Sequence, residues 1–118
     1  MTIHKLSIII PVYYNEKNLL PLYTDLSEKV LQKLECDYEL VMVDDGSKDD
    51  SYTVMQQLQK LDRHIKLVKL SRNFGSHAAI LAGLSVCTGD CAAMKAADLQ
   101  EPSELILDMM AKYEEGNK

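Results

Sequence analysis

Four short apolar runs constrain the fold of this chain more than any other feature of its sequence, and they recur at intervals of roughly 25 to 32 residues. The first two are dense in apolar and β-branched residues, which is typical of strands buried on both faces of a sheet. The third alternates like a strand nearer an edge, and the fourth is short. The runs are Leu6–Val12, Tyr38–Val43, Ile65–Leu70 and Cys91–Met94.

Each run is followed by a segment whose apolar residues have helical spacing. Asp49, Asp50 and Ser51 suit the start of the second helix, by capping and by interaction with the helix dipole. The third segment is mostly Ala, Leu and Ile, so we expect it to be largely buried. Pro102 is a favourable first-turn residue for the fourth. The segments are Leu19, Leu22, Tyr23, Leu26, Val30 and Leu34; Val54, Met55, Leu58 and Leu61; His77–Val86; and Leu105, Ile106, Met109, Met110 and Tyr113.

This strand and helix alternation predicts parallel strands joined by right-handed crossovers. The predicted fold class is therefore α/β, with a Rossmann-like, doubly wound and mainly parallel sheet. The 118 residues, 47% of them hydrophobic, fit one domain. Ligands of such sheets bind outside the carboxyl ends of the strands, so functional residues are expected just after each strand.

Composition excludes several functions. A net charge of −5, from 13 basic and 18 acidic residues, gives no electrostatic footprint for nucleic acid or an anionic membrane surface. No segment approaches the roughly 20 apolar residues of a membrane helix. The three cysteines lack zinc-type spacing. A phosphate-bearing ligand would need local donors or a metal to offset the negative charge.

A polar or aromatic cluster follows or adjoins each predicted strand. Taken singly, each cluster could be a turn or a helix cap. Four of them at one edge of a sheet instead indicate a shared ligand. The clusters are Pro11–Glu16, Asp44–Ser47, Ser71–Gly75 and Ala96–Gln100.

The side chains in these clusters suit a nucleotide diphosphate. Tyr13 offers a flat face for a base, and Asp44 or Asp45 can accept hydrogen bonds from a base N–H or a ribose hydroxyl. Arg72 presents a fork that matches phosphate oxygens, and a helix beginning near Gly75 directs free N–H groups at the same anion.

The last cluster has metal-binding chemistry. Asp98, with Gln100 two residues later, supplies hard oxygen ligands of the kind that Mg²⁺ or Mn²⁺ accepts alongside substrate phosphates. Magnesium keeps several waters, so two or three protein oxygens suffice. The sequence therefore predicts a divalent cation beside the nucleotide.

The ordered set of motifs resembles the family-two inverting glycosyltransferases. The resemblance is greatest to the branch that transfers a sugar from a nucleotide donor to polyprenyl phosphate, the dolichyl- and undecaprenyl-phosphate glycosyltransferases. The match runs from about Leu6 to Glu104 in the family's order. Its motifs are Ser7–Glu16, Val43–Asp49, Leu70–Gly75, Ala79–Leu84, Gly89–Asp90 and Asp98–Pro102.

The resemblance implies a GT-A fold whose first half binds the nucleotide sugar. Asp44 matches the acid that contacts the base, with Asp45 beside it, and Arg72 falls in the stretch near the diphosphate. Asp98 matches the metal ligand of the Asp-x-Asp motif, and Gln100 the glutamine that assists it. The nucleotide-sugar site implied by position comprises Pro11, Tyr13, Glu16, Asp44, Asp45, Arg72, Ala97 and Asp98.

Two positions depart from the family's pattern. Ala96 stands where the family usually has the first acid of its Asp-x-Asp motif, which weakens metal or ribose binding or marks a diverged, engineered or inactive form. Ser76 and His77 stand where the family tends to have a basic residue followed by an acid or amide. The missing positive charge makes phosphate binding more dependent on Arg72 and the metal.

The expected function is transfer of a sugar, with inversion, from a UDP- or GDP-sugar to an acceptor. The expected acceptor is polyprenyl phosphate or a glycan, at the cytoplasmic face of the membrane, in cell-envelope glycan synthesis.

No catalytic base is assigned within residues 1–118, and the acceptor-side catalytic residues are expected beyond Lys118. We interpret the chain as the N-terminal, nucleotide-sugar-binding part of a longer transferase domain that lacks its acceptor-side half. Any membrane association is expected through that C-terminal region.

Three alternatives belong to other classes. A nucleotide-sugar-binding fragment without catalysis fits the same residues. A receiver-type signalling domain has a similar length, but its acidic pair follows the first strand, and here Asp44 and Asp45 follow the second. A nicotinamide dinucleotide domain needs a glycine fingerprint after the first strand, and Pro11–Glu16 contains no glycine.

Overall fold

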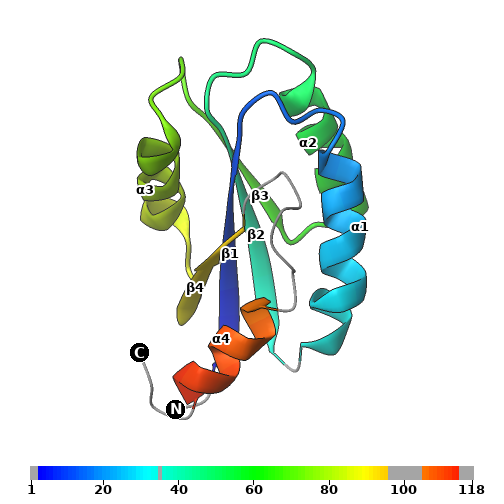
Figure 1. Ribbon diagram of the computed structural model, residues 1–118, viewed down its shortest axis with the longest axis vertical. Helices are drawn as coiled ribbons and strands as arrows, with labels where there is room; N and C mark the ends of the chain where they lie inside the picture. The colour runs from blue at the N-terminus through cyan, green and yellow to red at the C-terminus, as the bar shows by residue number, and fades with distance from the viewer. Residues whose placement is uncertain (1–2, 35, 96–104, 115–118) are drawn as a thin grey trace.

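The computed structural model describes residues 3–34, 36–95 and 105–114, and it has the predicted alternation of strands and helices. The strands form one parallel sheet in the order β3-β2-β1-β4 (Figure 1). The strands are β1 (Lys5–Val12), β2 (Asp37–Asp44), β3 (Ile65–Lys69) and β4 (Cys91–Met94), and the helices are α1 (Leu19–Lys29), α2 (Ser51–Leu61), α3 (Ser76–Val86) and α4 (Leu105–Glu114).

Strand β1 lies inside the sheet, paired with β2 on one side and β4 on the other. Its residues Ile8 to Ile10 are fully buried, because side chains that alternate between the two faces are covered on both. The chain first adds β2 and β3 on one side of β1 and then returns to place β4 on the other. The doubly wound sheet predicted from the sequence is therefore confirmed.

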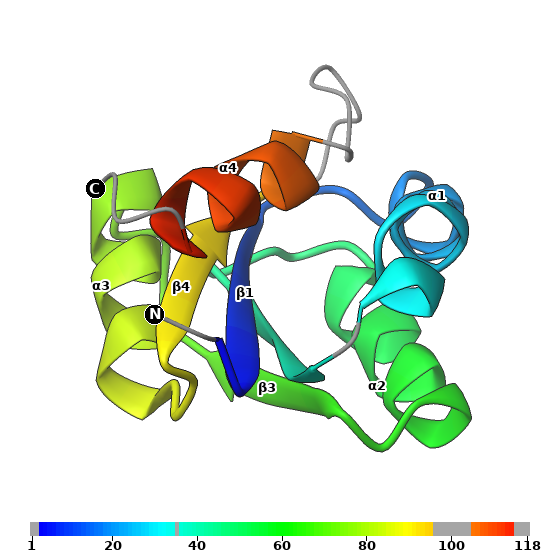
Figure 2. The same ribbon diagram turned by 90° about the horizontal axis from the view of Figure 1, so that it is seen from below.

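The larger core lies between one face of the sheet and three helices. Figure 2 shows α1, α2 and α4 on this face, with α3 on the opposite one. Leu6, Ile8 and Ile10 of β1 contribute here, and Ile106 and Met110 bring α4 against the same cluster. The predicted apolar stripes are buried in part: Leu19, Leu22 and Leu26 of α1 are buried, as are Met55 and Leu58 of α2, but Leu61 at the end of α2 is 72% exposed.

The smaller core lies under α3, and here one expectation was wrong. Only Ala79 and Gly83 of α3 are buried, whereas Leu81 is 66% exposed and Leu84 44% exposed. The helix approaches the sheet through its smallest residues: a Cβ on Gly83 would lie 2.6 Å from Ile9 Cγ2. Its larger side chains point away from the sheet, where none of the described elements forms a further layer over them.

The first helix is shorter than its apolar stripe predicts. It ends at Lys29, and Val30 leaves the helical region with φ of −126° and ψ of −61°. A 3₁₀ turn, η1 (Leu31–Lys33), follows, so Leu34 lies beyond the helix, although Val30 is still buried in the larger core. Among the helices that the structure describes, none has the length and apolar character needed to span a bilayer.

Candidate functional site

Three loops meet at the carboxyl ends of β1, β2 and β3, at the upper end of the molecule in Figure 1. Backbone hydrogen bonds join them: Asp45 N–H donates to Val12 O (2.8 Å), and Leu70 N–H donates to Asp44 O (2.9 Å). Three of the clusters predicted from the sequence are therefore adjacent in space.

The loop after β1 presents two tyrosines. Tyr13 and Tyr14 are each 46% exposed, and their rings meet edge to face with centroids 4.5 Å apart. Tyr14 has a positive φ of 54°, which is uncommon outside glycine, and its N–H donates to Ser47 Oγ (2.9 Å). Asn15 Oδ1 accepts from Tyr13 N–H (2.8 Å). This fixed, unusual backbone conformation holds an aromatic surface at the rim of the sheet.

Asp44, at the last position of β2, is fully buried. Its Oδ1 accepts a hydrogen bond from Ser47 N–H (3.1 Å). Its Oδ2 is shielded from solvent and has no partner within residues 3–34, 36–95 and 105–114. A buried acceptor without a partner is costly, so its position calls for an explanation, such as an ordered water, an ion or a ligand. Asp44 can therefore accept one further N–H or O–H hydrogen bond.

Asp45, only 3% exposed, turns toward the loop after β3. Its carboxylate accepts hydrogen bonds from Asn73 Nδ2 (2.9 Å), Phe74 N–H (2.8 Å) and Gly75 N–H (3.1 Å). Adjacent acids thus have different surroundings, because successive side chains at a strand end leave on opposite sides. The sequence did not distinguish them.

A cavity of about 410 Å³ opens between the three loops. Three of its lining residues are cations, Lys48, Lys69 and Arg72, which concentrate positive charge in a chain of net charge −5. This arrangement suits an anionic ligand. The lining residues are Tyr13, Tyr14, Gly46, Ser47, Lys48, Lys69, Leu70, Ser71, Arg72 and Asn73.

Sequence reasoning missed both lysines of this cavity. Lys69 ends β3, where its ammonium lies 4.9 Å from the centre of the Tyr52 ring. Lys48 follows the turn after Asp44 and Asp45. The available signal was position: Lys69 is the last residue of a strand, and Lys48 lies four residues after the end of another, in the region where ligand-binding groups of parallel sheets collect.

The other site residues predicted for the nucleotide sugar have different outcomes. Arg72 and Tyr13 line the cavity, whereas Asp44 and Asp45 do not line it but directly precede Gly46 and Ser47, which do. Pro11, within β1, and Glu16, in the turn before α1, are half-buried and do not line it.

The predicted metal and acceptor sites lie outside the described residues. Ala97, Asp98 and Gln100 fall there, as do the acceptor-side catalytic residues expected beyond Lys118, so all of these assignments stay predictions. Within the part of the chain that is described, no group of at least three His, Cys, Asp or Glu side chains could hold a metal ion.

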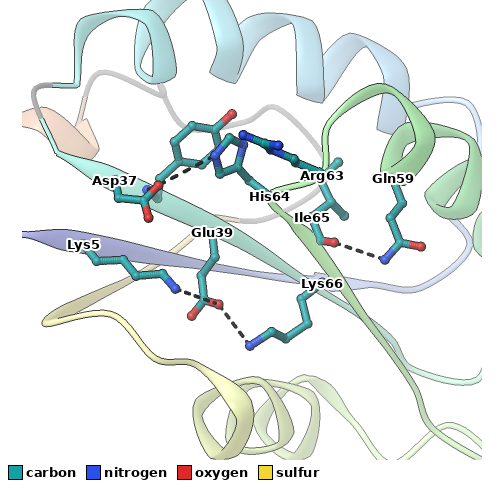
Figure 3. Close-up of a pocket in the computed structure, with 9 residues that line it drawn as sticks. Lys5, Asp37, Glu39, Gln59, Arg63, His64, Ile65 and Lys66 are labelled. Atoms are coloured by element: carbon teal, nitrogen blue, oxygen red, sulfur yellow. Dashed lines mark hydrogen bonds and ion pairs between the residues drawn. The ribbon is translucent and has the colours of Figure 1, made fainter.

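A second hollow, of about 340 Å³, lies at the amino end of the sheet (Figure 3). Glu39 is almost completely buried there, accepts hydrogen bonds from Ser7 Oγ (2.6 Å) and Thr88 N–H (2.6 Å), and lies 3.1 Å from Lys66 Nζ. Lys5 Nζ approaches the same carboxylate at 3.9 Å. Burial alone would raise the pKa of Glu39, but these hydrogen bonds and the Lys66 charge lower it to about 2.

Asp62 forms a similar closed network nearby. Its Oδ2 accepts from Tyr23 Oη (2.8 Å) and Tyr38 Oη (2.7 Å), and its Oδ1 accepts from His64 N–H (2.9 Å). Burial and the Asp62 hydrogen bond raise the pKa of Tyr23 to about 12 and also raise the pKa of Tyr38. The buried carboxylates of this end are therefore satisfied from within the fold.

A family model described as glycosyl transferase family 2 matches residues 7–118. The chain therefore belongs to glycosyl transferase family 2. The match covers all three loops of the site and all of the sheet except the first two residues of β1. The resemblance inferred from the motifs is confirmed.

Relatives in this family are similar along nearly the whole chain. The undecaprenyl-phosphate 4-deoxy-4-formamido-L-arabinose transferase of Proteus mirabilis is 42% identical over 97% of this chain and 35% of its own length. The uncharacterized glycosyltransferase YkcC of Bacillus subtilis is 41% identical over 93% of this chain and 34% of its own length. The chain thus spans about a third of the length of these curated relatives.

Solved structures of glycosyltransferases share the architecture. S. aureus TarS 1-349 in complex with UDP-GlcNAc superposes with a TM-score of 0.76 and 26% identity, covering 94% of this chain and 31% of that one. The mannosyltransferase PcManGT of Pyrobaculum calidifontis, in complex with GDP-Man and Mn²⁺, has a TM-score of 0.77 at 19% identity, covering 91% and 31%. The family-2 chain therefore has the fold class of the GT-A glycosyltransferases, over about a third of the length of these structures.

Proposed function

We propose that this chain is the nucleotide-sugar-binding part of an inverting glycosyltransferase. The observation that carries the proposal is the buried Asp44, whose Oδ2 lacks a partner among the described residues, beside a cavity ringed by Lys48, Lys69 and Arg72. One carboxylate oxygen can accept a base N–H or a ribose hydroxyl, and the cations suit a diphosphate. Tyr13 supplies an aromatic face for the base.

A divalent cation belongs to this proposal. Asp98 and Gln100 would hold it, since carboxylate and amide oxygens are the donors that Mg²⁺ and Mn²⁺ accept. When bound, the cation neutralises charge on the diphosphate leaving group. The Mn²⁺ in the PcManGT complex supports this assignment. Lys48, Lys69 and Arg72 contribute positive charge from the protein itself.

We propose polyprenyl phosphate as the acceptor of the whole protein. Support comes from the relatives named as undecaprenyl-phosphate transferases, 42 to 44% identical to this chain. A phosphate monoester has a second pKa of about 6 and is largely ionised at neutral pH, so it needs little help from a general base. Its oxygen forms a bond to the anomeric carbon, and the bond to the nucleoside diphosphate breaks, with inversion. A lipid acceptor would place this reaction at the cytoplasmic face of a membrane.

A second candidate is nucleotide-sugar binding without catalysis. It is favoured by Ala96, which replaces the first acid of the family's Asp-x-Asp motif. Such a protein would retain the Asp44 site and bind the donor but would not transfer its sugar. Comparing donor binding with sugar transfer to undecaprenyl phosphate, in the longest form of the protein, separates the two candidates.

Calorimetry tests the binding step. UDP, GDP and their sugars are titrated into the chain with and without Mn²⁺, and into the variants Asp44→Asn and Asp98→Ala. We expect binding that Mn²⁺ strengthens, an affinity at least tenfold lower in Asp44→Asn through loss of a charged acceptor, and no Mn²⁺ effect in Asp98→Ala. Absence of binding by the unaltered chain, or an undiminished affinity in Asp44→Asn, would overturn the proposal.

A further inference from the structure

Asp45 is fully engaged within the protein, unlike its neighbour Asp44. One oxygen accepts from Phe74 N–H at 2.8 Å, and the other accepts from Asn73 Nδ2 at 2.9 Å and Gly75 N–H at 3.1 Å. Asn73 Nδ2 also lies 3.3 Å from the Asp45 carbonyl oxygen. These bonds link the loop after β2 to the loop after β3 across 28 to 30 positions of sequence.

Phe74, whose N–H is bonded to Asp45, also contacts Arg72. The Arg72 guanidinium carbon lies 4.6 Å from the centre of the Phe74 ring, a stacked arrangement that restricts the side chain. Phe74 is 48% exposed, so packing in the core does not fix its position. The Phe74 backbone is instead held by the hydrogen bond from its N–H to Asp45 Oδ1, and the ring beside Arg72 extends from that backbone.

Gly46 lets the two loops approach closely enough for this contact. Its φ is 78°, and a Cβ there would lie 2.4 Å from both Arg72 C and Asn73 N. These are backbone atoms that cannot move without shifting the loop. Any larger residue would push the Arg72 peptide away while also adopting a strained backbone conformation.

We propose that Asp45 is a positioning residue that acts through Arg72. Its carboxylate holds residues 73–75, and the Phe74 ring then orients the Arg72 guanidinium toward the diphosphate of the nucleotide sugar. This role rests on the proposed function, because it assigns the ligand of Arg72. Asp45 itself makes no contact with the nucleotide.

A double-variant cycle tests this role. The dissociation constants of UDP and GDP, in the presence of Mn²⁺, are measured by calorimetry for the chain, for Asp45→Asn, for Arg72→Ala and for both changes together. Hydrogen exchange at the Phe74 and Gly75 amides is followed by NMR. Asp90→Asn is the matched control, because the Asp90 carboxylate also accepts two backbone N–H groups, His4 at 2.7 Å and Lys5 at 3.1 Å, away from the nucleotide site.

We expect Asp45→Asn and Arg72→Ala each to weaken nucleotide binding about tenfold, with the double variant no weaker than Arg72→Ala alone. The Phe74 and Gly75 amides should exchange faster in Asp45→Asn, and Asp90→Asn should bind like the unaltered chain. Phe74→Leu alters an exposed ring, so it should reproduce the binding defect even if Asp45→Asn folds poorly.

Two outcomes overturn the positioning role alone. One is unchanged affinity in Asp45→Asn or in Phe74→Leu while the unaltered chain binds nucleotide. The other is additive loss in the double variant, which would mean that Asp45 acts independently of Arg72. If the unaltered chain binds neither nucleotide, the proposed function fails, and the positioning role fails with it.

Discussion

Strand β2 carries a buried carboxylate near each end, and their surroundings differ. Near its start, Glu39 is bonded to Ser7 and Thr88 and ion-paired with Lys66 at 3.1 Å. At its end, Asp44 is as deeply buried, but one of its oxygens has no partner among the described residues. The Glu39 carboxylate is surrounded by donors from within the protein, whereas one oxygen of Asp44 can still accept a hydrogen bond.

The contrast teaches how a single strand can serve stability and binding. A buried charge whose partners are all internal is destabilising to remove, because a buried donor such as Ser7 then loses its charged acceptor. A buried carboxylate with an unbonded oxygen lowers the stability of the free protein, and a ligand that donates a hydrogen bond to that oxygen offsets the loss. Stability should therefore depend on the amino end of the sheet, and binding on the carboxyl end.

The largest expected effect is that of Glu39→Gln. The change leaves Lys66, Lys5 and Ser7 around a neutral side chain, so we expect the free energy of unfolding to fall by about 3 kcal/mol. Urea denaturation measures this value. Nucleotide affinity, extrapolated to conditions where the variant is folded, should not change. A fall in affinity without a fall in stability would reverse the roles assigned to the two ends.

Low pH should lower the stability of the protein through the same hydrogen bonds and ion pairs of Glu39. The pKa of Glu39 is lowered from 4.5 to about 2, so its contribution to stability is complete above about 4.5 and is lost as the pH falls toward 2. The pKa of Asp62 is also lowered, which acts in the same direction. The free energy of unfolding of the unaltered chain should fall by about 3 kcal/mol more over this range than that of Glu39→Gln. Parallel curves for the two proteins would contradict this.

The tyrosines bonded to Asp62 should give a smaller effect at high pH. Folding raises the pKa of Tyr23 from 10 to about 12, so its contribution is complete below 10 and is lost as the pH rises toward 12. Tyr23 and Tyr38 should titrate late in ultraviolet absorbance. Asp62→Asn should shift both back toward ordinary values, whereas Asp37→Asn, on the same strand as Tyr38, should leave Tyr23 unaffected.

The smallest expected change in stability is that of Asp44→Asn. The variant keeps an acceptor for Ser47 N–H and removes a buried charge, so the free energy of unfolding should change by less than about 1 kcal/mol. The same denaturation series, run beside Glu39→Gln, measures the difference. A loss as large as that of Glu39→Gln would show that Asp44 is a structural acid.

The fold was accessible from sequence because hydrophobic periodicity reports burial. The runs in β1 and β2 are apolar at nearly every position, as a strand covered on both faces requires, and both were predicted within one residue at each end. The error in α3 has the same origin: a uniformly apolar helix indicates burial all round, but the sequence does not show which layers cover it.

The site was accessible only in part. Position after a strand selected Tyr13, Asp44, Asp45 and Arg72, and the structure brings all four to one edge. Alternation along a strand gives Asp44 and Asp45 opposite directions, but which of them has internal partners for both oxygens depends on hydrogen bonds between loops some 28 residues apart, and no local pattern encodes those bonds. Asp98 and Gln100 lie outside the described residues, so the metal site is still a prediction.

The loop at residues 71–75 has a fixed length, and the chain is firmly held on both sides of it. Before the loop, Leu70 N–H donates a hydrogen bond to Asp44 O (2.9 Å). After it, α3 packs against β1 so closely at Gly83 that there is no room for a side chain. Inserting a single residue between these two contacts would leave both in place and force the loop to bulge outward. The folding of the loop should therefore tolerate changes of residue type far better than changes of length.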